Sequence, residues 1–340
     1  MTPTRRALLG LTAAAALCAP LSASAETLTG VYYIPPSYKD LSFGTQGFIE
    51  RLQAALPEGT TVDYFDSGTL VKADEQLPAL RSGNIDFMFH TTSYITRSVP
   101  ILGITGLPGV VEELYENPER MAIGSPLFDL INEKLAEENL YMLSMGGTVM
   151  EPEYLWSTED APIRTIEDMD GKKLRVVSFE ATEVVEDFGA AAVRIPSSEL
   201  FLALQRGTVD GAVMNISTVM GRSLHEELGE VLKLPLTAFG IGIFMELDDW
   251  EALSPEVQAA MTEAAQWFDA EAAKEANGAI YPNEFWPAIE AAGIEVIEPD
   301  QAMLDAMTEA AADVLEEWKA SVGEDVGQRA IDLATGAAES

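Results

Sequence analysis

The sequence has very few of the residues on which catalysis usually depends. It contains one cysteine, Cys18, and two histidines, His90 and His225, among 340 residues. Two histidines leave few candidates for a catalytic triad or a multi-histidine metal site, and neither a G-x-S-x-G nor an H-E-x-x-H pattern occurs. Cys18 lies in a segment that we expect to be removed, so the remaining chain has no thiol. We therefore expect a protein that is not an enzyme and that uses no cofactor and no metal.

Positive charge is also scarce. The chain has 20 Lys and Arg against 56 Asp and Glu, and its formal net charge is −36. Removing residues 1–25, which contain Arg5 and Arg6 and no acid, changes the charge to −38. A nucleic-acid partner is excluded on this ground, because phosphate binding needs a basic surface. Such an acidic surface is typical of a highly soluble protein.

The N-terminal 25 residues have the pattern of an export signal. Arg5 and Arg6 precede an apolar run from Ala7 to Ala19, and 23–25 supplies small residues for a signal peptidase. We predict cleavage after Ala25 and a periplasmic location, because the apolar run is too short to span a bilayer. The arginine pair fits a twin-arginine signal, and it also begins many ordinary secretory signals, so both export routes stay open.

Two distant stretches resemble each other. "ALRSGNIDFMF" at 79–89 and "ALQRGTVDGAV" at 203–213 each predict the end of a helix, a glycine, and a short apolar strand that contains an aspartate. A strand-like run, "TTVDYF" or "AAVRIP", and a helix precede each of them. The pattern predicts one β-α-β unit used twice, each unit forming a parallel pair of strands, and hence two similar α/β lobes. For the second helix we expect Ser197 or Ser198 as the N-cap residue.

One long helix is predicted near residues 254–276. Ser254 is suited to cap its N-terminus, and Pro255 to occupy its first turn. A second helix is expected from about Gln301 to Ala320. No linker rich in Pro, Gly or Ser separates the halves, so we expect the lobes to be interwoven rather than consecutive.

The strand "KLRVV" at 173–177 places a charge among apolar residues. Arg175 is flanked by Leu174 and Val176, where a solvated charge is not expected. A guanidinium there needs a partner, and a carboxylate matches its geometry best. That carboxylate belongs either to a ligand or to an internal salt bridge, and the residues alone do not separate the two. His90, which follows another predicted strand, either lines a cleft or is an ordinary buried histidine.

The region from Pro162 to Asn215 resembles the extracytoplasmic solute receptors of tripartite ATP-independent periplasmic (TRAP) transporters, the DctP-like family. The resemblance depends on "GKKLRV" and on "ALQRGTVDG", and weaker similarity covers nearly the whole chain after residue 25. It implies two lobes that close on a small organic acid, with Arg175 paired to the ligand carboxylate. It also implies ligand-site roles for Asn215, Phe201 and Gln76.

The resemblance also implies an architecture for the whole chain. We expect a periplasmic-binding-protein-like α/β fold, with a ligand cleft between the lobes and a long connecting helix. The first lobe is expected to comprise 26–149 and about 239–275. The second is expected to comprise 150–238 and about 276–340.

The chain departs from this family at "GGTVMEPEYLWS". Many members carry a second arginine there, and this sequence has Glu151 and Glu153 instead. If these glutamates face the cleft, a second ligand carboxylate would meet like charge, so we expect a monocarboxylate with a polar or cationic group. The alternative is that both glutamates face solvent.

The expected function is a periplasmic receptor that delivers a small organic acid to the membrane subunits of a TRAP transporter. An ABC-type binding protein and an exported ligand-sensing domain are alternatives that the sequence does not distinguish. An exported hydrolase or lyase is a third alternative, although the chain lacks a recognisable nucleophile, base or metal site.

Overall fold

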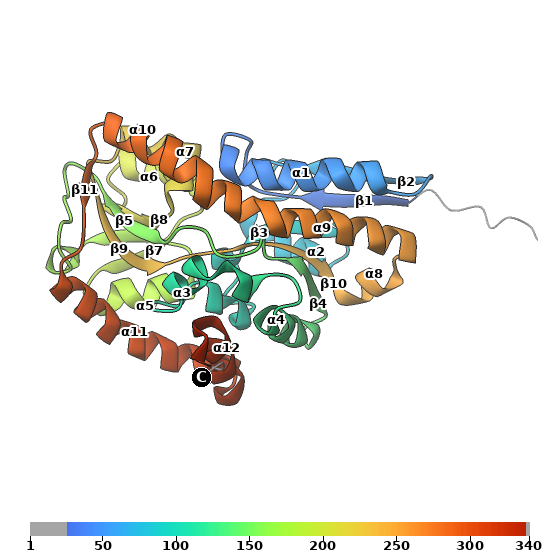
Figure 1. Cartoon of the computed structure of the whole chain (residues 1–340). Coiled ribbons are helices and arrows are strands. Elements are labelled where there is room, and N and C mark those ends of the chain that lie inside the picture. Colours follow the sequence, from blue (N-terminus) through green and yellow to red (C-terminus); the bar gives the residue numbers. More distant parts are fainter. Residues whose placement is uncertain (1–25, 338–340) are drawn as a thin grey trace, which may run out of the picture.

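The computed structural model describes residues 26–337, so the predicted signal segment 1–25 lies outside the described residues. The chain forms two β-sheets covered by helices, and we call each sheet with its helices a lobe (Figure 1). In spatial order, the first sheet consists of β2 (Thr60–Phe65), β1 (Glu26–Val31), β3 (Phe87–Thr91), β10 (Ile241–Glu246) and β4 (Leu140–Ser144). The second consists of β11 (Glu295–Ile297), β9 (Glu230–Thr237), β5 (Glu153–Ser157), β8 (Gly211–Met214), β6 (Lys173–Val176) and β7 (Ala191–Arg194).

Each lobe contains one unit of the same design. The first unit is β1, α1 (Lys39–Ala55), β2, α2 (Ala73–Arg81) and β3, and the second is β6, α5 (Phe179–Asp187), β7, α6 (Ser197–Gln205) and β8. The predicted repeat is therefore real, but the prediction that its strands form a pair is wrong. β2 and β3 both run parallel to β1, which lies between them, and β7 and β8 flank β6 in the same way. In each sheet the first strand of the unit, β1 or β6, lies between the two strands that were predicted to pair.

The lobes are interwoven by three passages of the chain. It crosses between the sheets after β4, returns between β9 and β10, and crosses again through α9 (Pro255–Glu275) to β11. The predicted cap of α9 is confirmed, because the Ser254 hydroxyl accepts a hydrogen bond from the Val257 amide at 3.3 Å. α9 lies along α1 and continues through a π-helical segment, Ala276–Phe285, into α10 (Trp286–Ala291) (Figure 1). This continuous helix reaches both lobes.

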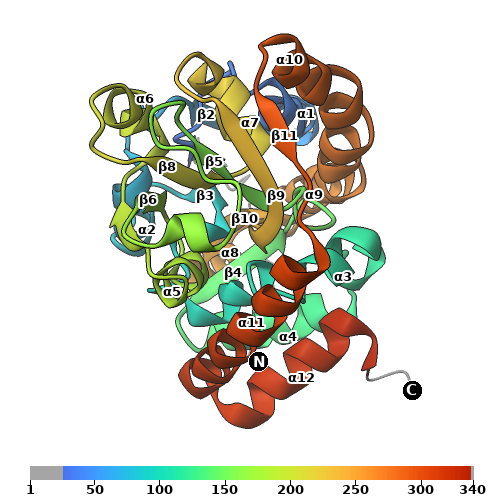
Figure 2. The same ribbon diagram turned by 90° about the vertical axis from the view of Figure 1, so that its left-hand side faces the viewer.

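The C-terminal helices cover the opposite side of the molecule. α11 (Gln301–Val322) packs against α5, and α12 (Glu324–Thr335) packs against α3 (Val111–Glu116) and α4 (Pro126–Ala136) (Figure 2). The shorter helical elements are α7 (Ile216–Gly221), α8 (Leu247–Ala252) and the 3₁₀ turns Thr92–Tyr94, Pro100–Thr105, Pro118–Met121, Glu167–Met169 and Leu224–Glu226. The residue boundaries assigned to the lobes stay a prediction.

Residues 26–337 contain neither a candidate membrane span nor a candidate metal cluster. No helix in this range combines the length and the apolar character needed to cross a membrane. No three His, Cys, Asp or Glu side chains of the same range lie together as metal ligands would.

Candidate ligand site

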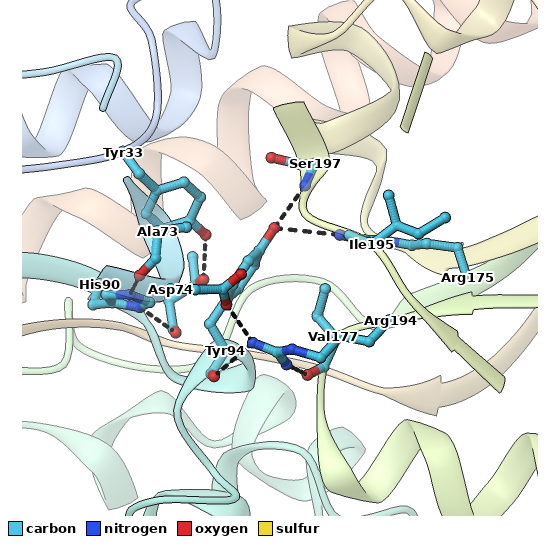
Figure 3. Close-up of polar contacts among 11 residues, drawn as sticks. Tyr33, Ala73, Asp74, His90, Tyr94, Arg175, Val177, Arg194, Ile195 and Ser197 are labelled. Carbon is cyan, nitrogen blue, oxygen red and sulfur yellow. Dashed lines mark hydrogen bonds and ion pairs between the residues drawn. The ribbon is translucent and has the colours of Figure 1, made fainter. Parts of the chain in front are cut away.

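Arg175 lies in β6 of the second lobe and is almost fully buried, with 2% of its surface exposed. Its Nε donates to the Ile195 carbonyl at 2.9 Å, and its Nη1 donates to the Val213 carbonyl at 3.2 Å. Its Nη2 lies 3.4 Å from the hydroxyl oxygen of Tyr94, which comes from the first lobe (Figure 3). The two carbonyls fix the guanidinium in the sheet, and the third nitrogen is directed at the other lobe.

The structure does not contain the internal salt bridge that was the alternative reading of Arg175. Among the described residues, no carboxylate oxygen lies within the 4.0 Å of its guanidinium nitrogens that defines an ion pair. Its hydrogen-bond partners are neutral oxygens. A buried guanidinium held only by neutral acceptors retains a strong preference for a carboxylate.

A small cavity of about 20 Å³ adjoins Arg175, with room for about one water molecule. Both lobes contribute to its wall. From the first lobe come Tyr33, Ile34, Tyr38, Leu41, Thr91, Ser93 and Tyr94, and from the second lobe and the connecting segments come Glu153, Arg175, Val177, Ser197, Thr218 and Phe239. The closed arrangement of the lobes therefore brings one guanidinium, one carboxyl group and several aromatic rings to a single point.

Glu153 begins β5 and is buried, with 3% exposure. Burial raises its pKa to about 7, while the nearby charge of Arg175 and the backbone amide of Asn215 act in the opposite direction. Of the two glutamates predicted from sequence, Glu153 is the one that lines the cavity. Its carboxyl group can change protonation state near neutral pH.

Glu151 lies outside the cavity wall. It is also buried, and its carboxylate accepts hydrogen bonds from Trp286 Nε1 at 3.0 Å and from the Tyr154 hydroxyl at 3.1 Å. Burial raises the pKa of this carboxyl group, and Lys233 lowers it. The alternative, that both glutamates face solvent, is thus not what the structure shows. The contacts of Glu151 are with the segment where the long helix enters the second lobe, so its ligand role stays a prediction.

Asn215 is fully buried, and its side chain has two partners. Its Oδ1 accepts the Ser217 amide at 2.8 Å and caps α7, and its Nδ2 donates to the Glu151 carbonyl. Phe201 lies on α6, half-buried against the core. Neither side chain is part of the cavity wall, and their roles at the ligand also stay predictions.

His90 and Gln76 are buried in the first lobe. Both ring nitrogens of His90 lie within hydrogen-bond distance of backbone carbonyls, 2.9 Å from Thr91 and 3.1 Å from Ala73 (Figure 3). Desolvation lowers the pKa of this imidazole. Gln76 donates to the Val71 carbonyl at 3.3 Å, and its Oε1 is buried without a partner among the described residues. The contacts of His90 are those of an ordinary buried histidine, and the ligand-site roles of His90 and Gln76 stay predictions.

Tyr94 was missed by the sequence reasoning and is central to the site. Its hydroxyl oxygen accepts from the Ser197 amide at 2.8 Å as well as from Arg175 (Figure 3). Ser197 starts α6 and Pro196 takes the N-cap position, so the expected capping role of Ser197 or Ser198 is wrong. The signal that could have identified Tyr94 is its position just after β3, because the carboxyl ends of parallel strands line ligand crevices.

Two α/β lobes that meet over a buried arginine at a small cavity are typical of a solute receptor. The chain belongs to the family described as bacterial extracellular solute-binding protein, family 7, which matches residues 41–321. The predicted family and the two-lobed fold are confirmed, and the chain is a solute-binding protein rather than an enzyme.

Individual relatives are distant in sequence. A solute-binding protein of Albidiferax ferrireducens is 28% identical over 48% of this chain and 47% of its own length. The ectoine-binding periplasmic protein TeaA of Halomonas elongata is 27% identical over 60% of each chain. The matches thus span about half to three fifths of these two relatives.

Solved structures are similar over nearly the whole chain. The extracytoplasmic solute receptor DctP6 of Bordetella pertussis, which binds pyroglutamic acid, has a TM-score of 0.80 with 18% identity, covering 91% of this chain and 99% of that one. A TRAP periplasmic solute-binding protein of a Sulfitobacter species, with bound β-D-galacturonate, has a TM-score of 0.76 with 21% identity and the same coverage. At such identities the similarity establishes the fold.

Proposed function

We propose that this protein is a periplasmic receptor that captures a small organic acid between its lobes and delivers it to the membrane subunits of a TRAP transporter. The carboxylate of the ligand is bound by Arg175. The observation that carries this proposal is a guanidinium with 2% exposure at a cavity wall, with an Nη2 that meets only a neutral hydroxyl.

Two donors converge where the ligand carboxylate is proposed to bind. Arg175 Nη2 and the Ser197 amide at the start of α6 both point to the Tyr94 hydroxyl oxygen. A carboxylate oxygen accepts both a guanidinium and a helix N-terminal amide more strongly than a phenol does, because it carries charge. Opening the lobes withdraws Tyr94 from these donors, and the ligand then takes its place before the lobes close.

The rest of the wall defines the other end of the ligand. Glu153 can accept a hydrogen bond from a hydroxyl or pair with an ammonium group, and Tyr33, Tyr38 and Phe239 supply aromatic surface that suits a cation. A second carboxylate would instead face the Glu153 carboxyl group. We therefore propose a monocarboxylate with a hydroxyl, amino or other cationic group. Pyroglutamic acid and ectoine, the ligands named for two relatives, are both small monocarboxylates.

The partner and the location are proposed with the support of the family. Export with cleavage after Ala25 and docking on TRAP-type membrane subunits are proposed from the sequence pattern and the resemblance. An ABC-type transporter or a sensory receptor would use the same binding fold. Co-purification with membrane subunits encoded beside the gene separates these partners.

A thermal-shift screen tests the binding function. The panel comprises hydroxy and amino monocarboxylates, dicarboxylates, polyols and betaines, with recovery of each hit to show that it returns unaltered. A ligand at about 100 times its dissociation constant adds roughly 2.7 kcal/mol to the free energy of unfolding. Stabilisation by polyols alone would contradict a carboxylate anchor, and conversion of a hit would contradict a receptor.

A further inference from the structure

A second and larger hollow lies outside the cavity. It is a groove of about 610 Å³, open to solvent, and its wall includes α2, the segment after β3, and β7. Three arginines line it: Arg81, Arg97 and Arg194. Its volume is in the range of small-molecule sites, whereas the inner cavity has room for about one water. We call this feature the arginine groove.

The groove concentrates positive charge in a chain that has little. The sequence has 20 Lys and Arg, two of which lie in the predicted signal segment, and three of the rest meet here. Asp74 is the one carboxylate in the groove wall, and it is paired with Arg194 at 2.5 Å. Arg81 pairs at 2.6 Å with Glu138, outside the wall. The wall therefore carries a formal excess of two positive charges.

Arg97 is the least neutralised of the three arginines. It is exposed, its Nη2 lies 3.3 Å from the Thr182 hydroxyl, and its guanidinium lies 5.7 Å from the centre of the Phe179 ring. Within residues 26–337 it has no ion pair with a carboxylate, although its charge partly offsets the rise that burial causes in the pKa values of nearby Glu180 and Glu183. An incoming anion can pair with Arg97 without displacing a carboxylate.

Tyr94 separates the groove from the inner cavity. It lines both, with its hydroxyl directed at Arg175 and its backbone carbonyl accepting from Arg194 at 3.3 Å (Figure 3). The Arg194 guanidinium also lies 5.8 Å from the centre of the Tyr94 ring. The two sites thus lie on opposite sides of one side chain, which must move for the cavity to admit a ligand.

We propose that the arginine groove is a second binding site, a low-affinity encounter site for small carboxylate anions on the path to Arg175. The transfer step rests on the proposed function, whereas the binding of carboxylates in the groove does not. In a protein of charge −36, long-range attraction cannot collect anions, so the local positive charge of the groove beside Tyr94 attracts them at short range instead. Anions held by Arg97 and Arg194 are released to the cavity as Tyr94 withdraws with the first lobe.

The test removes Arg175, the proposed carboxylate anchor of the inner cavity, so that any remaining carboxylate binding can be assigned to the groove. Saturation-transfer NMR with pyroglutamate as the probe is applied to the Arg175→Ala variant, alone and combined with Arg97→Gln. Arg206→Gln is the matched control, because Arg206 is an exposed arginine at the far end of α6. The uncharged lactam 2-pyrrolidinone is the control ligand. Circular dichroism checks folding, and Arg175→Lys replaces Arg175→Ala if the alanine variant does not fold.

We expect pyroglutamate to bind weakly when the inner anchor is absent, and Arg97→Gln to reduce this affinity about two- to fivefold, as for one exposed charge pair. The effect should shrink as salt is raised. Arg206→Gln should change nothing, and 2-pyrrolidinone should not bind. The groove site is overturned if the Arg175→Ala variant does not bind pyroglutamate at all, or if it binds pyroglutamate equally well with and without Arg97→Gln. Absence of tight carboxylate binding in the wild type overturns instead the proposed function, so the two failures are distinguishable.

Discussion

The hydroxyl oxygen of Tyr94 lies 3.4 Å from Nη2 of Arg175, although the two residues belong to different lobes. The same oxygen accepts the first amide of α6 at 2.8 Å. A group of the first lobe is thus bound by two donors of the second, so this oxygen joins the two lobes. In the proposed binding mode the ligand carboxylate takes these same two donors, which would couple ligand binding to lobe closure.

The first prediction concerns Arg175. Replacing it by alanine removes the proposed carboxylate anchor, and losing a buried charge-assisted pair typically costs roughly 2–5 kcal/mol of binding free energy. The best ligand from the thermal-shift screen should bind about 30-fold more weakly or worse in calorimetry. The melting temperature should also fall, because the Ile195 and Val213 carbonyls lose their donor.

Arg175→Lys is the control for this experiment. It keeps the charge and loses the planar donor geometry, so it should bind better than the alanine variant and worse than the wild type. A folded alanine variant with wild-type affinity would show that Arg175 is only a structural residue.

Parts of the fold were predictable because they rest on local patterns. The cap at Ser254 and the repeated helix-glycine-strand segments depend on residues near in sequence. The position of β1 between β2 and β3 could not be predicted in this way, since no local signal tells which strand of a sheet is inserted between two others. The wrong pairing in each repeat follows from that limit.

The site shows the same limit more strongly. An apolar strand with one arginine identified Arg175, but Tyr94 reaches it from a segment about eighty positions away, through closure of the lobes. Glu151 and Glu153 seemed equivalent in the sequence because they are two residues apart. β5 begins at Glu153, so strand alternation does not extend to Glu151, and only Glu153 of the two lines the cavity.

The second prediction is a fall in stability with rising pH. The pKa values of Glu153 and Glu180 are raised to about 7 by burial, above the ordinary value of 4.5. The folded protein therefore binds protons more tightly than the unfolded chain. This contribution is fully present below the ordinary pKa and is lost as the pH rises through about 7. Chemical denaturation in high salt should give a lower free energy of unfolding at about pH 8 than at about pH 5.

Glu153→Gln provides the control for the pH series. The amide does not titrate, so the decline between those two pH values should become shallower. Glu180→Gln should reduce it separately. A decline of unchanged steepness in both variants would assign the pH dependence to the general negative charge of the protein rather than to these carboxyl groups.

The third prediction concerns ligand choice. Glu153 lines the cavity and Glu151 does not, so Glu153→Gln should change the preference between ligands while Glu151→Gln should not. In calorimetry, the wild type should prefer an amino or hydroxy monocarboxylate to the dicarboxylate of equal chain length. Removing the Glu153 charge should narrow this preference, because the second carboxylate then meets an amide. A wild-type preference for the dicarboxylate would contradict the proposed ligand class, and equal effects of both variants would contradict the placement of Glu153 alone at the ligand.

The fourth prediction separates support of the fold from ligand contact at Asn215. Its Oδ1 caps α7 by accepting the Ser217 amide, and its Nδ2 donates to the Glu151 carbonyl. Losing a cap costs about 0.5–2 kcal/mol, and an unpaired buried carbonyl costs about 1–3 kcal/mol. Asn215→Ala should therefore lower the free energy of unfolding by about 2 kcal/mol or more in urea titrations, on the basis of these two losses. Asn215→Asp keeps the acceptor, and only its protonated carboxyl group can donate to the Glu151 carbonyl, so its cost should be smaller at low pH than at a pH where the buried carboxylate is charged. If Asn215 instead contacts the ligand directly, as the family resemblance implies, both variants should bind the ligand more weakly than the wild type even under conditions in which they are fully folded. Affinity that stays unchanged in the folded Asn215→Asp variant would leave Asn215 the role of joining α7 to the segment before β5.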